Sequence, residues 1–178
     1  LSDNILQRVQ KSGWVEGIAS DIKTLLQKMK TFYTQPDNLY PIKIREEKVI
    51  DSTLLSTSAT VSQYPSPGVI YTLLDKLKAY AASKGARQTG LPMLNISRKT
   101  NESYLARVAL PVNKKLPDTN DIQYRWMLGG GNILVAEIKG GPLKIQQAFT
   151  IIEQYADDFN RVAPAIPFQS LITDRRVE

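Results

Sequence analysis

Cysteine and histidine are both missing from this 178-residue sequence. Without cysteine there is no disulfide framework and no thiol nucleophile, and zinc sites built from cysteine and histidine are excluded. Without histidine there is no Ser–His–Asp triad and no imidazole to serve as a general base. Any acid–base chemistry must therefore use carboxylates, lysine or tyrosine, and we expect neither a metal nor a cofactor.

Long apolar runs are also missing. No stretch reaches the roughly 20 apolar residues that a membrane-spanning helix needs. The chain begins with Leu1 rather than methionine, so we expect it to be a fragment preceded by a further domain, a signal peptide or a membrane anchor. The compartment stays open between cytoplasmic and extracytoplasmic, because a lack of cysteine fits both.

The charge is moderately basic, with 23 Lys and Arg against 17 Asp and Glu. Hydrophobic residues make up 42% and charged residues 22%, which is the balance of an ordinary soluble protein. The basic residues are interleaved with acidic and apolar ones rather than gathered in one run. We therefore expect no specific nucleic-acid binding, only weak binding that salt removes.

The N-terminal segment, residues 1–38, predicts a helical connector. Apolar residues recur every three or four positions from Ile5 to Phe32, as on one face of a helix. Gly13 and Gly17 predict a break between two shorter helices, and Pro36 ends the helical pattern. Two interpretations stay open: a helix packed on the body of the protein, or a stalk that leads to something upstream.

The rest of the chain shows the same order twice, strand then helix then strand. The two copies span about residues 41–112 and 122–178, and each helix opens with a proline, Pro67 or Pro142. Proline suits the first helical position because its missing N–H is not needed there. We interpret this as an internal duplication of a βαββ unit. The second copy stops at Glu178, so its last strand is apparently missing.

The predicted fold class is α+β. Two βαββ units related by a pseudo-twofold axis would form an antiparallel sheet with both helices on one face, in addition to the N-terminal helix. The opposite, concave face would then offer a cleft between the repeats, which is a common place for a small molecule to bind.

Three short motifs carry a family resemblance. Lys139–Pro142 follows an apolar strand and precedes an amphipathic helix, Arg107–Val112 is a strand that ends in Leu-Pro-Val, and Gly129–Gly131 precedes the second apolar strand. In this order and spacing, the sequence resembles the GyrI-like proteins over residues 41–178. The same domain is the effector-binding domain of multidrug-responsive transcription activators.

The resemblance implies a duplicated βαββ fold with an aromatic pocket at its centre, which binds amphiphilic and often cationic organic molecules. Relatives often carry an acidic residue just before the end of the strand that corresponds to Arg107–Val112. In this sequence the same neighbourhood carries Arg107. Some relatives follow helix-turn-helix DNA-binding domains, some stand alone, and a few resemble hydrolases that use glutamates in the same pocket. Residues 1–40 show no helix-turn-helix pattern.

Five residues are the candidate ligand-binding site. The rings of Tyr104, Trp126 and Phe168 could form the walls by stacking, and Arg107 or Glu137 could supply the charge. Glu137 stands in a strongly apolar run and would favour a cation, whereas Arg107 would favour a carboxylate or phosphate. The alternatives are that both charges face solvent and that the rings are core residues.

The predicted function is the non-catalytic binding of a small amphiphilic organic ligand in this cleft, as in a sensor or a regulatory module. Two alternatives stay open. A small hydrolase would use Glu137 together with a second acid, and a protein-interaction module would have its pocket filled by side chains such as Trp126 or Tyr104.

Overall fold

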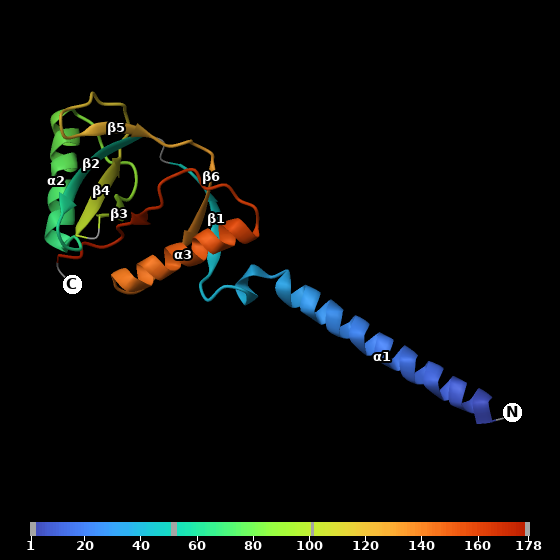
Figure 1. Ribbon diagram of the computed structural model, residues 1–178. Helices are drawn as coiled ribbons and strands as arrows, with labels where there is room; N and C mark the ends of the chain where they lie inside the picture. The colour runs from blue at the N-terminus through green and yellow to red at the C-terminus, as the bar shows by residue number, and fades with distance from the viewer. Residues whose placement is uncertain (1–2, 51–52, 101, 177–178) are drawn as a thin grey trace. The chain divides into compact units, whose positions relative to one another are not determined.

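The computed structural model describes residues 3–50, 53–100 and 102–176 (Figure 1). The helices are α1 (Asp3–Tyr33), the short 3-10 helix η1 (Pro36–Asn38), α2 (Pro67–Ser83) and α3 (Pro142–Asp158). The strands are β1 (Ile44–Lys48), β2 (Thr53–Val61), β3 (Met93–Thr100), β4 (Ser103–Pro111), β5 (Gln123–Trp126), β6 (Asn132–Ala136) and β7 (Gln169–Ser170). The predicted α+β class with an N-terminal helix is confirmed. The expectations about Leu1 and Glu178 concern residues outside the described ranges.

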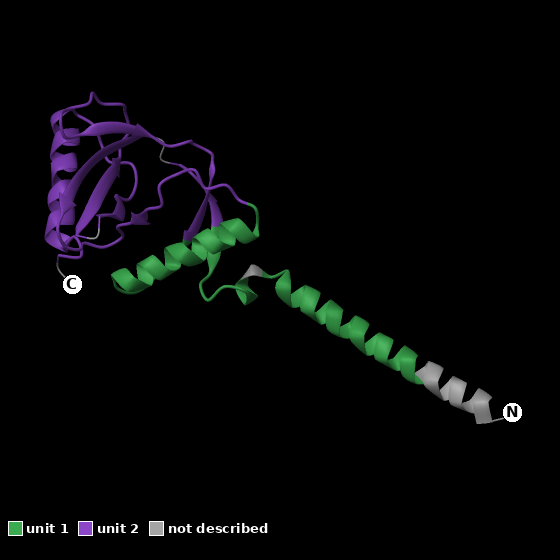
Figure 2. Ribbon diagram, in the orientation of Figure 1, with its two compact units in different colours: residues 1–45, 136–160 green, residues 46–135, 161–178 purple. Residues whose placement is uncertain are grey.

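The chain divides into two compact units (Figure 2). Unit 1 consists of residues 1–45 and 136–160, and unit 2 consists of residues 46–135 and 161–178. The helix of the first predicted repeat, α2, therefore lies in unit 2, and the helix of the second, α3, lies in unit 1. The equivalence of the two repeats, and the placement of both helices on one face, stay predictions.

Unit 2 is built on a five-stranded antiparallel sheet with the order β5-β2-β4-β3-β7. Its strands β2, β3 and β4 and the helix α2 follow the predicted βαββ order of the first repeat. The second-repeat strand at residues 168–173 shortens to β7, because only two of its residues pair with β3.

A second, two-stranded sheet pairs β1 with β6, so the predicted single joined sheet is wrong. The glycine run after β5 explains the separation. Gly130 adopts φ +76°, a left-handed conformation that interrupts the strand. Val49 then bonds to this turn on both sides: its N–H donates to the Gly131 carbonyl at 2.8 Å, and its carbonyl accepts from Gly130 N–H at 2.9 Å.

The core of unit 2 lies between α2 and one face of the sheet. Ser66 caps the helix by accepting a hydrogen bond from the N–H of Val69 at 3.4 Å, and Pro67 occupies the first turn, as predicted for this proline. Apolar side chains then recur every three or four residues along α2, so that one stripe is buried. This stripe consists of Ile70, Tyr71, Leu74, Leu77 and Ala81. The sheet residues that meet it are Leu55, Leu94, Val108 and Leu110.

Unit 1 contains α1 and α3. The helix α1 is continuous from Asp3 to Tyr33, so the predicted break between Gly13 and Gly17 is wrong. A glycine inside a helix costs only about 1 kcal/mol relative to alanine, which the other residues can offset. Tyr40, between η1 and β1, donates its hydroxyl hydrogen to Oδ2 of Asp158, the last residue of α3, at 2.6 Å. This hydrogen bond is the main cause that raises the pKa of Tyr40 to about 12.

Within the ranges that the structure describes, no helix combines the length and apolar character needed to cross a bilayer.

Candidate functional site

A cleft of about 660 Å³ opens in unit 2. Its floor comes from the sheet face opposite the one that packs on α2, and Leu73 and Lys76 of α2 also contribute to its lining. Strand alternation sets this division: Leu55 and Val108 point to the core, so Ser56 and Arg107, one position away on the same strands, belong to the other face. The floor of the cleft therefore belongs to the face of the five-stranded sheet that does not pack on α2.

Small side chains form the floor of the cleft. In the strand register, Ser56 lies opposite Ala109 on β4, and Ala109 lies opposite Met93 on β3. The next row places Ser58, Arg107 and Asn95 side by side across the same three strands. A serine and an alanine at the centre of one row leave a hollow, because neither side chain reaches far above the sheet.

The walls come from two segments beside the sheet. Trp126 and Met127 stand at the end of β5, and Ile166 and Phe168 stand on the segment that enters β7. Trp126 is 62% exposed and Phe168 is half-buried. The walls are thus apolar and aromatic and partly open to solvent, which suits the flat body of an organic molecule.

Arg107 is held in place by a short chain of hydrogen bonds. Its Nη1 donates to Asn95 Oδ1 at 3.3 Å, and Asn95 Nδ2 donates to the carbonyl of Pro167 at 2.8 Å. Pro167 directly precedes Phe168, so the same bonds attach the Phe168 wall to the sheet. Arg107 is half-buried and lies in the second row of the floor, on the central strand β4.

The charge of the cleft is positive. Its charged lining residues are three bases, Lys76, Arg107 and Arg125, and one acid, Asp121. Lys76 and Asp121 form an ion pair at 2.9 Å, and Arg125 donates to the amide of Gln123. Among the described residues, neither Arg107 nor Arg125 pairs with a carboxylate. The uncompensated charge is therefore that of two guanidinium groups.

The structure brings three of the five predicted site residues together. Arg107, Trp126 and Phe168 all line the cleft. Tyr104 does not, because it precedes Arg107 by three positions on β4 and therefore belongs to the opposite face. It packs edge-on against Tyr64, with ring centroids 5.6 Å apart.

Glu137 belongs to unit 1 and is not buried. The strand β6 ends at Ala136, so Glu137 lies just beyond the strand. Its side chain is 74% exposed and forms an ion pair with Arg45 at 2.9 Å. The expectation of a buried carboxylate is wrong, and the alternative that this residue faces solvent holds.

Asn95, Ser56 and Ala109 are cleft residues that sequence reasoning missed. A weak signal was present, since the two serines at positions 56 and 58 alternate with the apolar face of β2. These residues come together because β2 pairs with β4 and β4 pairs with β3, and these strand pairings cannot be read from a single sequence.

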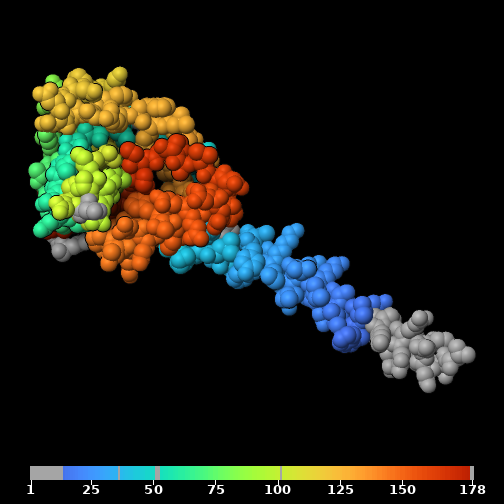
Figure 3. All heavy atoms as spheres, in the orientation of Figure 1, coloured from blue at the N-terminus to red at the C-terminus, as the bar shows by residue number. Residues whose placement is uncertain are grey.

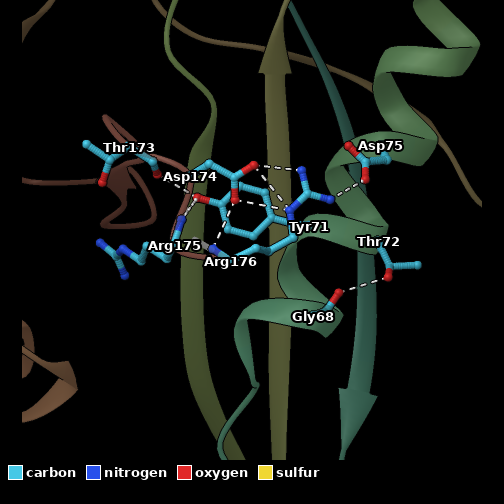
Figure 4. Close-up of polar contacts among 8 residues, drawn as sticks. All are labelled: Gly68, Tyr71, Thr72, Asp75, Thr173, Asp174, Arg175 and Arg176. Atoms are coloured by element: carbon cyan, nitrogen blue, oxygen red, sulfur yellow. Dashed lines mark hydrogen bonds and ion pairs between the residues drawn. The ribbon is translucent and has the colours of Figure 1, made fainter. Parts of the chain in front are cut away.

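The segment that carries Phe168 is fixed to α2 at its far end (Figure 4). The Tyr71 hydroxyl donates to the Thr173 carbonyl at 2.6 Å and accepts from the backbone N–H of Arg175 at 2.9 Å. Arg176 bonds to Asp174 at 2.7 Å and to Asp75 on α2 at 2.9 Å. We call these contacts, from Tyr71 and Asp75 to residues 173–176, the C-terminal latch.

The charged groups of the C-terminal latch shift each other's pKa values. Hydrogen bonds from Arg176 hold the pKa of Asp174 below its ordinary value, and the bond with Asp174 raises the pKa of the Arg176 guanidinium. The Arg176 guanidinium also lies 4.8 Å from the centroid of the Tyr71 ring, within cation–π range. The latch therefore joins a buried aromatic residue to a surface ion-pair network.

The cleft contains little that could perform acid–base catalysis. Its single carboxylate, Asp121, is already paired with Lys76. No group of three or more Asp or Glu residues within the described ranges could hold a metal ion. The arrangement is suited to hold an organic anion between aromatic walls.

No protein-family model matches the sequence, and no curated protein matches it. Among solved structures, the chain is similar to one in the cryo-electron microscopy structure of an EcmrR–DNA complex, in the assembly named EcmrR-RPo. The two are 14% identical, with a TM-score of 0.56 over 93% of this chain and 62% of that one. The likeness is one of fold, and this chain spans about 62% of the length of that neighbour.

Proposed function

We propose that unit 2 is a non-catalytic binding module for a small amphiphilic organic anion, such as an aromatic carboxylate, and that it serves as a sensor. The observation that carries this proposal is the position of Arg107, which is half-buried in the floor of an open cleft and forms no ion pair with any carboxylate in the described part of the chain. The same observation favours an anion over the cation that many GyrI-like proteins bind.

The chemistry of Arg107 fits a carboxylate. A guanidinium has five N–H donors in a rigid plane, and two of them match the two oxygens of a carboxylate. One donor of Arg107 is already used on Asn95, and this bond helps to fix the orientation of the plane. Enough donors remain for two parallel bonds to a ligand.

The dimensions and the walls fit an organic body attached to that anion. A volume of about 660 Å³ lies within the range of small-molecule sites. Trp126 and Phe168 offer ring faces that accept a flat molecule without a fixed hydrogen-bond pattern. A highly polar anion such as inorganic phosphate would use Arg107 but gain nothing from these walls.

The sensor role is supported by the likeness of fold to EcmrR, which was solved in complex with DNA. For this chain we infer that the 178 residues alone do not bind DNA selectively, because the basic residues are interleaved with acidic ones. Regulation would then require a further domain or partner that responds when a ligand binds in the cleft.

The proposal is tested by calorimetric titration of the chain with three molecules of similar shape: naphthoate, naphthylmethanol and naphthylmethylammonium. We expect the carboxylate to bind best. Arg107→Gln should weaken naphthoate at least tenfold, since hydrogen bonds to charged groups contribute about 1.5–3 kcal/mol. Trp126→Ala should weaken all three molecules by losing a stacking surface worth about 1 kcal/mol or more.

The matched control is Arg87→Gln, which removes the same charge at an exposed position outside the cleft. It should leave the affinity within about twofold of wild type. Tighter binding of the cation than of naphthoate, or equal losses in Arg107→Gln and Arg87→Gln, would show that Arg107 does not recognise the ligand.

A further inference from the structure

The cleft of unit 2 contains a second guanidinium group, that of Arg125, on the same face of the sheet as Arg107. Arg125 on β5 lies opposite Leu54 of β2. Arg107 on β4 lies opposite Ser58 of the same strand. Positions 54 and 58 are an even number of residues apart on β2, so the rows to which they belong share one face. Both arginines line the cleft, whereas the proposed function depends on Arg107 alone.

The strand register sets the distance between the two arginines. The strands β5 and β4 are the neighbours of β2 on its two sides, so the arginines are two strand spacings apart across the sheet, roughly 10 Å. Along the strands, the four residues from Leu54 to Ser58 add roughly 13 Å. The two arginine Cα atoms are therefore roughly 16 Å apart, on a diagonal of the sheet.

The hydrogen bonds of the two side chains show where each guanidinium group points. Arg107 donates to Asn95, its partner on β3 in the strand register, so it leans across the sheet and away from β5. Arg125 donates to Gln123, two positions earlier on β5, so it leans along the strand toward the row of Ser56. The two groups stay on opposite sides of the floor, and a single carboxylate is too small to span them.

Each arginine is close in the fold to an aromatic wall. Trp126 follows Arg125 directly at the end of β5. Phe168 follows Pro167, whose carbonyl accepts the hydrogen bond from the Asn95 side chain. In the space-filling view, β5 and the segment that enters β7, in gold and red, both reach the surface of unit 2 (Figure 3). The cleft therefore has a guanidinium group and a partly exposed ring at each of its two ends.

We propose that the ligand of this cleft is an elongated dianion, an aromatic dicarboxylate with one carboxylate at each end of a flat body. One carboxylate binds Arg107 and the other binds Arg125, and the rings lie over Ser56 and Ala109. The small side chains of these two residues matter here, because a bulky one would lift the flat body away from both guanidinium groups. This inference rests on the proposed function, since it adds a second anchor to the same anion site.

The charge of the cleft matches a dianion better than a monoanion. Lys76 and Asp121 neutralise each other, and in the described part of the chain neither Arg107 nor Arg125 forms an ion pair with a carboxylate. A monoanion would leave one guanidinium group without a counter-charge. Arg125 is exposed, so water screens its contact, and the second carboxylate should add less affinity than the first.

The test compares naphthalene-2,6-dicarboxylate with its monomethyl ester by calorimetric titration of the full chain. The two molecules have nearly the same shape, but the ester has a single charge. Wild type should bind the dicarboxylate about fivefold more tightly, which is the scale of a partly exposed ion pair. Arg125→Gln should remove this advantage and leave the affinity for the ester within about twofold of wild type. Arg87→Gln, at an exposed position outside the cleft, is the matched control and should keep the advantage.

The isomer naphthalene-2,3-dicarboxylate separates the geometry of the ligand from its net charge. It has the same charge and the same number of carboxylates, but both lie at one end of the rings and cannot reach the two arginines together. It should therefore bind within about twofold of the ester. Equal affinities for the two isomers would show that net charge alone produces the gain, and would overturn the proposal.

A second readout is the NMR shift of the Nε–Hε group of each arginine, assigned with Arg107→Gln and Arg125→Gln. The 2,6 isomer should shift both groups, and the ester should shift mainly that of Arg107. If the ester binds through Arg107 but the dicarboxylate gains no affinity and leaves Arg125 unshifted, the second anchor is wrong and the proposed function stands. If neither molecule binds, or if Arg107→Gln changes the affinity for neither, both proposals are wrong.

Discussion

The C-terminal latch predicts that one hydroxyl group on α2 stabilises a wall of the cleft. Tyr71→Phe removes only this group, and the ring stays buried at 4% exposure. The change eliminates the bond to the Thr173 carbonyl and the bond from the Arg175 N–H. The contact of Arg176 with the ring face needs no hydroxyl and is retained.

The magnitude follows from these two bonds. Each contributes about 0.5–1.5 kcal/mol net, so the free energy of unfolding of unit 2 should fall by about 1–3 kcal/mol. The control is Tyr80→Phe, which removes a single bond to the Pro117 carbonyl near the surface. This second variant should lose less than about 1 kcal/mol.

The assay combines urea unfolding with amide hydrogen exchange. In Tyr71→Phe, the Arg175 amide should exchange at least tenfold faster, because its acceptor is gone. Binding of naphthoate should weaken severalfold, since residues 173–176 fix the segment that carries Phe168. A loss of stability below about 0.5 kcal/mol, or equal losses in Tyr71→Phe and Tyr80→Phe, would refute the structural role given to the latch.

Two further predictions concern acid and DNA. Because Arg176 lowers the pKa of Asp174, the stabilisation from this carboxylate is present above its ordinary pKa of 3.8 and is lost as the pH falls through the lowered value. The protection factors of the amides of residues 173–176, which correct the exchange rates for the intrinsic effect of pH, should therefore fall only below about pH 4. Asp174→Asn should remove this pH dependence, and protection factors that stay constant in wild type would contradict the prediction. In mobility-shift titrations at about 150 mM salt, the chain should show only weak, salt-removed DNA binding, and tight selective binding would overturn the inference.

Local signals predicted much of the fold. The helices α2 and α3 start at the prolines that mark them, Pro67 and Pro142, and the hairpin of β3 and β4 follows the alternation of its residues. These features depend on neighbours within a few positions, which a sequence displays. The predicted break in α1 was wrong because it was inferred from Gly13 and Gly17 alone, without the helix propensity of the residues on either side.

The candidate site was harder to predict, for two different reasons. The error with Tyr104 was avoidable, because residues 104 and 107 of one strand cannot share a face. The role of Asn95 could not be predicted from the sequence, because it depends on the pairing of β3 with β4 and on the contact of Asn95 with the Pro167 carbonyl. The prediction that Glu137 is buried was wrong because it depended on where the strand ends: β6 ends at Ala136, one residue before Glu137.

The central claim is that Arg107 recognises the negative charge of a ligand. The most direct measurement is the ratio of the affinities for naphthoate and naphthylmethanol, in wild type and in Arg107→Gln. Wild type should prefer the carboxylate at least tenfold, and the preference should disappear in Arg107→Gln while the affinity for the alcohol stays the same. A preference that survives the substitution would contradict the account.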